Sequence, residues 1–271
     1  MFSRRRFMPA LLLSLLFLLI HFTALAFDAL WPEIGGIDVK SNSSLVVDMT
    51  HAADGYIMAR AEPSSKSYKL RVKQGKYTLT YDLNSNGDYE VFPLQMGDGK
   101  YSVSLYKNAS GKKYSTAGSV SFKVKLNNPY SPYLYPNQYV NYTPITEAVS
   151  LSDVICGSCT TDQEKFDAVR AFILSNYSYD FSKAASVGKG VLPDINYCTS
   201  FRTGICQDLA ATAACMLRVQ GVPTRLIIGY AGKTYHAWNT VLIDGKEVLY
   251  DPTADLNGID GKIKYSTERY Y

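Results

Sequence analysis

The hydrophobic pattern of this chain changes from a strand period to a helical period at Thr161, and this change constrains the fold more than any other feature. Between residues 37 and 126, apolar and polar residues alternate, as in Tyr68–Val72, which is typical of half-buried β-strands. Glycine-containing turn signals such as 97–99 separate the runs. From Thr161 to about Ser175 the apolar residues follow a helical period instead, and a second helical stripe follows Cys206. The sequence therefore predicts an all-β, sandwich-like domain followed by an α+β domain.

The second region has clear start and stop signals. Thr161–Glu164 is a capping-box sequence that begins a helix, and Gly221 stops the helix that starts at or just before Cys206. Asp244-Gly245 is a strong two-residue hairpin signal. The expected elements are helices over 161–175 and 206–220, a loop over 184–190, and strands over 225–229, 235–243 and 247–251.

A thiol, an imidazole and a carboxylate follow one another here, as Cys206, His236 and Asp251. A thiol is mostly protonated near neutrality, so an imidazole must take its proton and a carboxylate must fix the imidazole tautomer. At a helix N-terminus, free backbone N–H groups and the helix dipole favour a thiolate, and the N–H of Cys206 itself can donate to an oxyanion. These three residues are predicted to be a catalytic triad.

The hairpin permits a geometric test of this triad. If the turn pairs Ile243 with Lys246, Asp251 lies diagonally opposite His236 on the same face of the sheet, about 7 to 8 Å away at Cα. Their side chains can therefore meet. Trp238 shares this face, where it is expected to shield the pair from water or to shape the substrate pocket, ordinary packing being the alternative.

Three blocks in this order resemble the transglutaminase-like superfamily: Gly204-x-Cys206-x-Asp208-x-Ala210 with the following Gly221–Arg225, then His236–Asn239, then Asp251–Thr253. The resemblance covers roughly Tyr135 to the C-terminus. It implies a papain-like core in which the cysteine-bearing helix packs on an antiparallel sheet. It further implies a thioester acyl-enzyme, made from a peptide or protein amide and resolved by an amine or by water.

The family often completes its oxyanion hole with an aromatic or amide side chain. The resemblance points to Tyr179, with Gln207 as a second candidate. Nothing outside the catalytic blocks resembles the calcium-dependent animal enzymes, and no EF-hand-type loop is present, so we expect no metal and no cofactor.

The N-terminus has the composition of an export signal. Arg4–Arg6 precede a Leu-rich run that ends in Ala24-Leu25-Ala26, which favours a cleaved signal peptide over residues 1–26 and a secreted or cell-surface protein. An uncleaved N-terminal membrane anchor is the alternative. Removal of residues 1–26, which contain these three arginines and no acidic residue, would reduce the net charge from +4 to +1. This charge gives no electrostatic basis for binding nucleic acid.

The expected domains are a β-sandwich (Ig-like) accessory domain over 27–127, a Pro- and Tyr-rich connector over 128–150 and a catalytic domain over 151–271. The connector is expected to be ordered and to pack on the catalytic domain, an aromatic sugar-binding strip being the sharper alternative. Cys156 and Cys159 are expected to be a structural disulfide or plain thiols, and Cys215 a core residue.

The leading hypothesis is an exported cysteine acyltransferase or amide hydrolase. Its partners would be a peptide or protein amide and, for transamidation, an amine acceptor, and the cell envelope is a further candidate partner. The alternative is a noncatalytic cell-surface binding module that uses the same fold as a scaffold. A redox role for Cys156 and Cys159 is a weaker third hypothesis.

Overall fold

The architecture is described from a computed structural model for residues 28–188, 190–259 and 262–271. The predicted signal peptide lies outside these residues. Within them, no helix is both long enough and apolar enough to cross a membrane.

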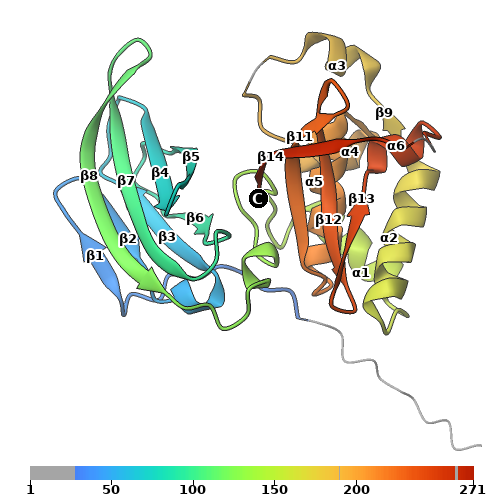
Figure 1. Cartoon of the computed structure of the whole chain (residues 1–271), viewed down its shortest axis with the longest axis horizontal. Coiled ribbons are helices and arrows are strands. Elements are labelled where there is room, and N and C mark those ends of the chain that lie inside the picture. Colours follow the sequence, from blue (N-terminus) through green and yellow to red (C-terminus); the bar gives the residue numbers. More distant parts are fainter. Residues whose placement is uncertain (1–27, 189, 260–261) are drawn as a thin grey trace, which may run out of the picture.

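The N-terminal half consists of two four-stranded antiparallel sheets, and most of their buried side chains belong to one hydrophobic cluster, while Tyr56 and Met58 belong to a second, smaller one. Tyr68, Leu70 and Val72 are buried while the residues between them are more exposed, because successive side chains of a strand point to opposite faces. The predicted all-β region is confirmed (Figure 1). One sheet has the order β1 (Val39–Ser41), β2 (Leu45–Asp48), β3 (Tyr56–Ala61), β6 (Glu90–Pro93), and the other β5 (Tyr77–Leu83), β4 (Tyr68–Gln74), β7 (Gly99–Ser110), β8 (Lys113–Val124).

The C-terminal half is built around another four-stranded antiparallel sheet, which is covered by helices. In Figure 1 the helix α5 (Cys206–Arg218) lies along this sheet, and every residue from Asp208 to Arg218 is buried. The α+β prediction is therefore confirmed. The strand order is β13 (Lys246–Tyr250), β12 (Thr234–Ile243), β11 (Thr224–Ala231), β14 (Tyr265–Tyr270). The other helices are α1 (Glu147–Cys156), α2 (Asp162–Asn176), α3 (Phe181–Ser186), α4 (Ile195–Phe201) and α6 (Pro252–Leu256).

The helix starts and the hairpin agree with their sequence signals. Thr161 caps α2 with the reciprocal contacts of a capping box. The turn between β12 and β13 places Asp244 and Gly245 at positive φ, 49° and 77°, and pairs Ile243 with Lys246. These are the dihedral signs of a type I′ turn, which matches the twist of the two strands.

Other elements were not predicted, and the expected loop over 184–190 is wrong at its start because α3 extends to Ser186. Asp180 caps α3 and Asp194 caps α4, each accepting a backbone N–H bond through its side chain. Both helices are short, so their caps and tertiary contacts matter more than any periodic apolar pattern. The strand β14 was also missed.

The connector contains a short 3₁₀ turn, η2 (Ser131–Tyr133), and packs as expected. The ring of Tyr139 stacks on Tyr271 with centroids 3.6 Å apart, and the carbonyl of Tyr135 accepts a 2.7 Å bond from Arg218. The Nε2 of Gln95, from the sandwich, donates to the carbonyl of Tyr270 in β14. These contacts join the two halves, while the domain boundaries at 127 and 150 stay predictions.

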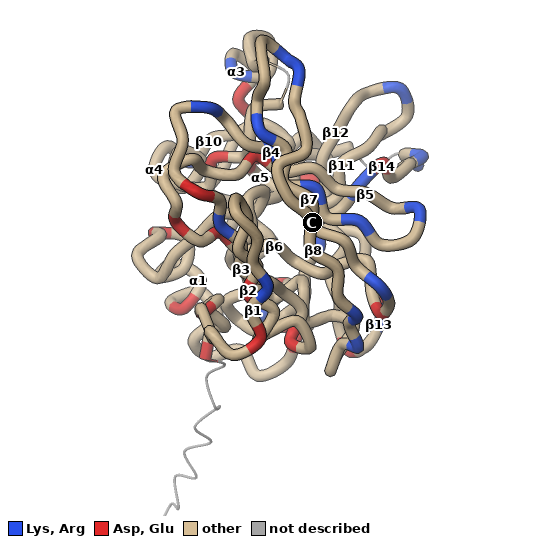
Figure 2. The backbone as a smooth tube through the Cα atoms, turned by 90° about the vertical axis from the view of Figure 1, so that its left-hand side faces the viewer, with Lys and Arg blue, Asp and Glu red and all other residues tan. Residues whose placement is uncertain are grey.

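Figure 2 views the molecule with the sandwich towards the reader, and it shows both basic and acidic positions around the perimeter.

Candidate active site

Cys206 is the first residue of α5, as the sequence predicts. The chain reaches it through β10 (Thr203–Gly204), which pairs with β9 (Ser178–Tyr179). A Cβ on Gly204 would lie 2.8 Å from the Cβ of Asp208 and 2.9 Å from the Sγ of Cys198. Only a glycine therefore lets this segment approach the helix closely enough to place the thiol at its N-terminus.

His236 and Asp251 form a short hydrogen-bonded pair. The Nε2 of His236 lies 2.7 Å from Oδ2 of Asp251, and the two side chains are only 11% and 4% exposed. Asp251 also accepts bonds from the hydroxyl of Tyr265 at 2.8 Å and from the N–H groups of Thr253 and Ala254. These bonds fix the carboxylate of Asp251 in position beside the imidazole.

Asp251 reaches His236 from a helix cap and not from the paired strand position that was expected. The predicted register holds from Ile243 to Asn239, whose partner is Tyr250. The strand then ends, and Asp251 caps α6 instead of continuing the ladder. Pro252 explains this, because it lacks an N–H for the ladder and is well suited to the first turn of a helix.

The surroundings of His236 favour its charged form. Burial acts to lower its pKa, but the hydrogen bond to Asp251, together with Cys206, outweighs burial and raises the pKa to about 9. For Asp251, burial acts to raise the pKa, and the bond from His236 and the helix-cap bonds hold it below the usual value. An imidazolium paired with a carboxylate is therefore the stable state near neutral pH.

Cys206 and His236 line the same small cavity, of about 80 Å³, which opens next to a larger one of about 780 Å³ that also contains Cys206. Since Nε2 of His236 is used by Asp251, the other ring nitrogen, Nδ1, is left for the thiol. A positive imidazolium beside a sulfur atom at a helix N-terminus stabilises a thiolate. The structure thus brings together all three residues of the predicted triad.

The other cysteines have a different environment. Burial raises the pKa of Cys156 to about 11 and that of Cys198 to about 12, and it raises the pKa of Cys215 further. Cys215 is a core residue, as expected. All five cysteines are free thiols in this structure. Of the two states expected for Cys156 and Cys159, a disulfide or plain thiols, the structure shows plain thiols.

Tyr179, the first oxyanion candidate, lies beside Cys206. Burial and then the neighbouring Cys206 and Asp208 raise the pKa of its phenol, while a hydrogen bond from the backbone of Cys206 lowers it. Gln207 also lines the larger cavity, but its Nε2 donates to the carbonyl of Val191 at 3.0 Å. The geometry thus favours Tyr179 over Gln207.

Trp238 lies behind the pair, with 2% of its surface exposed, and does not line either cavity that contains Cys206 among the described residues. Its ring is stacked with His236 at a centroid distance of 6.2 Å and is tilted against Tyr265 at 4.8 Å. This position suits both the predicted shielding role and the alternative of ordinary packing, and it does not suit the predicted role in a substrate pocket.

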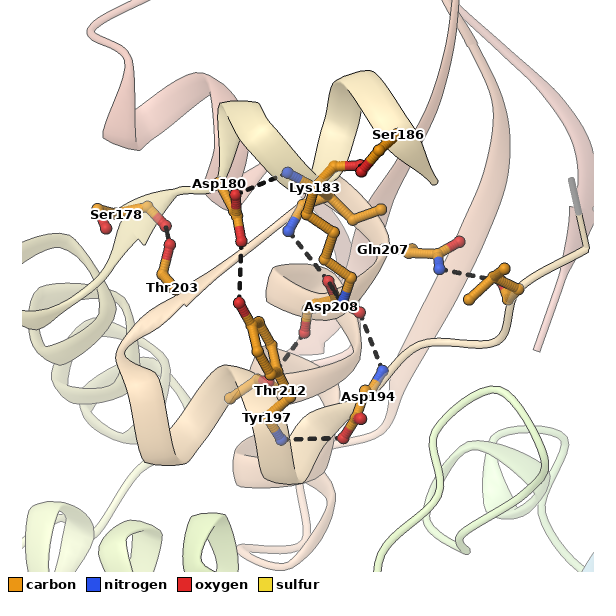
Figure 3. A network of polar contacts seen from close by, with 12 residues as sticks. Ser178, Asp180, Lys183, Ser186, Asp194, Tyr197, Thr203, Gln207, Asp208 and Thr212 are labelled. Atoms are coloured by element: carbon orange, nitrogen blue, oxygen red, sulfur yellow. Dashed lines mark hydrogen bonds and ion pairs between the residues drawn. The ribbon is translucent and has the colours of Figure 1, made fainter. Parts of the chain in front are cut away.

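A buried carboxylate fixes the start of α5 (Figure 3). Asp208 is fully buried and accepts bonds from the ammonium of Lys183 at 2.7 Å, the N–H of Asp194 at 2.9 Å and the N–H of Ile205 at 3.0 Å. It thereby ties α3 and the start of α4 to the residue that precedes Cys206. The family-like run contained Asp208, but the spacing alone did not indicate this structural role.

Tyr265 and Arg269 are the site residues that the sequence reasoning missed. Both belong to β14, which lies more than ten residues after Asp251 in the sequence. Its tyrosines and charged residues alternate only weakly in hydrophobicity, so the strand gave little signal. Tyr265 supports Asp251, and Arg269 lines both cavities that contain Cys206. Within the described residues, no group of three or more His, Cys, Asp or Glu is placed to hold a metal ion.

Residues 149–252 match the family model of the transglutaminase-like superfamily, and this segment contains all three residues of the triad. The protein therefore has a transglutaminase-like domain, and the expected papain-like core is confirmed. No curated protein matches the chain in sequence.

Several solved structures show a partial likeness to this chain, with low sequence identity and TM-scores of 0.40 or below. One, from Cytophaga hutchinsonii and described as a candidate cysteine protease, is 15% identical, with 80% of this chain and 69% of that one covered and a TM-score of 0.40. The periplasmic domain of TgpA from Pseudomonas aeruginosa is 15% identical over 84% and 77% of the two chains, with a TM-score of 0.36. Red sea bream transglutaminase is 12% identical over 77% and 49%, with a TM-score of 0.33.

Proposed function

We propose that the protein is an exported cysteine enzyme that acts on peptide or protein amides through a thioester. The observation that carries the proposal is the 2.7 Å bond between His236 and Asp251 in a cleft shared with Cys206 at a helix N-terminus. The family match supports it. The export signal predicted for residues 1–26 supports a position outside the cytoplasm, secreted or at the cell surface.

The chemistry follows from this geometry. The thiolate of Cys206 attacks the amide carbon, and the resulting oxyanion accepts hydrogen bonds from the backbone N–H of Cys206 and the phenol of Tyr179. The imidazolium of His236 gives its proton to the leaving amine, which leaves a thioester. Neutral His236 then takes a proton from water or from a second amine as that molecule attacks the thioester carbonyl. Cleavage of the thioester releases the acid or the new amide and restores the thiolate and the imidazolium.

Alkylation of the thiol tests this proposal before any substrate is identified. We expect limiting iodoacetamide to label Cys206 selectively below pH 8, where an ordinary thiol is mostly protonated and reacts slowly. Intact mass measures the rate, and peptide mapping locates the label. Cys206→Ala should abolish rapid labelling, and His236→Gln should slow it at least tenfold.

The two outcomes separate the competing hypotheses. Rapid labelling that needs His236 justifies a search for amide substrates and amine acceptors. If Cys206 is labelled no faster than an ordinary exposed thiol and His236→Gln has no effect, the catalytic proposal fails. The noncatalytic binding module would then be the remaining function for this fold.

A further inference from the structure

Arg269 forms part of the wall of three neighbouring cavities. Two are the cavities of about 780 and 80 Å³ that contain Cys206, and the third is a groove of about 500 Å³. Tyr139 is shared between the groove and the smaller of the two cavities at Cys206. The groove and the nucleophile are therefore connected through the surroundings of Arg269.

The groove lies between two strand edges. On one side is β5, the outermost strand of its sheet in the sandwich, and on the other is β14, the outermost strand of the C-terminal sheet. The side chain of Gln138 bonds the N–H and carbonyl of Asp82 at one end of β5. The side chain of Gln95 bonds the carbonyl of Tyr270 at the end of β14. Residues 77–80 and 267–269 line the groove. Open strand edges present rows of backbone donors and acceptors, which an extended peptide can satisfy.

The guanidinium of Arg269 has no carboxylate partner among the described residues. Its Nη2 donates to the hydroxyl of Tyr235, and its Nε is buried without a hydrogen-bond partner. The described lining of the two cavities at Cys206 contains no Asp or Glu, and Glu268 lines only the groove. A partly buried guanidinium without a counter-charge is suited to bind a carboxylate of a ligand.

A β-bulge places Arg269 in this position. Ile228 pairs with Arg269, but the next residue, Gly229, pairs with Thr267, so Glu268 is the extra residue. A Cβ on Gly229 would lie 2.0 Å from the carbonyl oxygen of Ser266, and the close approach of β14 therefore needs glycine. Bulges commonly re-aim a side chain beside an active site.

We propose that the substrate reaches Cys206 as an extended polypeptide segment lying between β5 and β14, and that an Asp or Glu side chain of this segment pairs with Arg269. This inference rests on the proposed function and names its substrate class. Arg269 is then a specificity-determining residue. Among the described residues, no hydrogen bond or ion pair joins Arg269 to Asp251 or His236, so we assign it no part in proton transfer.

Electrophilic peptides test the inference directly. Each nine-residue peptide contains one chloroacetamide, which the thiolate of Cys206 attacks to form a thioether with loss of chloride, and one Asp that is moved along the sequence. Each is matched by the same peptide with Asn. At the best position we expect the wild-type protein to be labelled at least tenfold faster by the Asp peptide, because a charge-assisted pair at a partly buried site is worth more than a neutral contact.

Variants assign this preference to its cause. Arg269→Gln should reduce the Asp-to-Asn ratio to below about twofold, and Arg269→Lys should retain part of it. Lys264→Gln removes the same charge from an exposed position earlier in the chain and is the matched control, so its ratio should equal that of the wild type. A three-residue Asp peptide should be labelled several times more slowly than the nine-residue peptide, because it cannot lie along the groove.

The outcomes separate this inference from the proposed function. If iodoacetamide labels Cys206 rapidly but Asp and Asn peptides react equally at every position, the carboxylate pairing is wrong and the cysteine enzyme stands. A preference that persists in Arg269→Gln would assign it to another charge, such as His236, and would also overturn the inference. Equal rates for short and long peptides would overturn the extended binding mode. Slow labelling by iodoacetamide would instead contradict the proposed function.

Discussion

At the scale of single residues, the bond between His236 and Asp251 decides the charge of the imidazole. Burial acts to lower the pKa of His236, and the carboxylate and the thiol together raise it to about 9. In a Cys206→Ala background we therefore expect Asp251→Asn to lower the pKa of His236 below 6.5, since burial then dominates. Proton NMR of the imidazole measures this pKa, and the signal of His51 in the sandwich should not differ between the variants.

The same residue pair makes stability depend on pH. Because the folded-state pKa of His236 is raised, its contribution is fully present below about pH 6.5 and is lost as the pH rises through about 9. The lowered pKa of Asp251 gives a contribution that is present above 3.8 and is lost as the pH falls below it.

Urea unfolding of the wild type and His236→Gln checks this window. We expect the difference in their free energies of unfolding to shrink by about 3 kcal/mol between pH 6 and pH 10. A difference that stays constant across this range would show that the imidazole is not held in its charged form.

At the scale of elements, Asp208 links three helices, and its loss should disturb the start of α5. Asp208→Asn replaces one of the oxygens that accept bonds from Lys183, Asp194 and Ile205. We expect the free energy of unfolding to fall by about 3 kcal/mol, because the partly buried ammonium of Lys183 loses its counter-charge and only one acceptor oxygen remains for the N–H donors. We also expect slower alkylation of Cys206. Asp167→Asn, on the exposed face of α2, is the matched control and should change neither measurement.

At the scale of the whole molecule, one buried guanidinium joins segments that are far apart in the sequence. Arg218 is fully buried and donates to the carbonyls of Thr224 at 2.9 Å, Tyr135 at 2.7 Å and Tyr271 at 2.9 Å. Burial lowers the pKa of its guanidinium to about 10, so the carbonyl dipoles hold a charge that burial disfavours. The end of α5, the connector and the C-terminal strand are fixed to one another by this side chain.

Arg218→Met keeps an unbranched apolar stem but is shorter, and it removes all three bonds. We expect it to destabilise the chain by about 3 to 5 kcal/mol, because three buried carbonyls lose their donor. Calorimetry should show a lower melting temperature. Arg71→Met, in β4 of the sandwich at an exposed position, should leave the transition nearly unchanged. Equal effects of the two substitutions would contradict a joining role for Arg218.

Local signals predicted the elements that carry the triad. The capping box at Thr161, the hairpin at Asp244-Gly245 and the stop at Gly221 each need only a few neighbouring residues, so a sequence displays them directly. The order of Cys206, His236 and Asp251 was equally readable, because each residue type has a distinct part in thiol chemistry. The short helices α3 and α4 have capping aspartates but are too short to show a periodic apolar face, so they were not predicted.

The sequence by itself thus determined the all-β and α+β halves, the family resemblance and the identity of the triad, because these depend on residue types, spacing and local periodicity. Only the tertiary structure decided that Asp251 meets His236 from a helix cap, that Tyr265 supports it and that Trp238 is buried behind the pair. The tertiary structure also decided that Arg269 faces the cleft. These outcomes depend on where a strand ends, where a bulge falls and which distant segments pack together, and no local pattern encodes them.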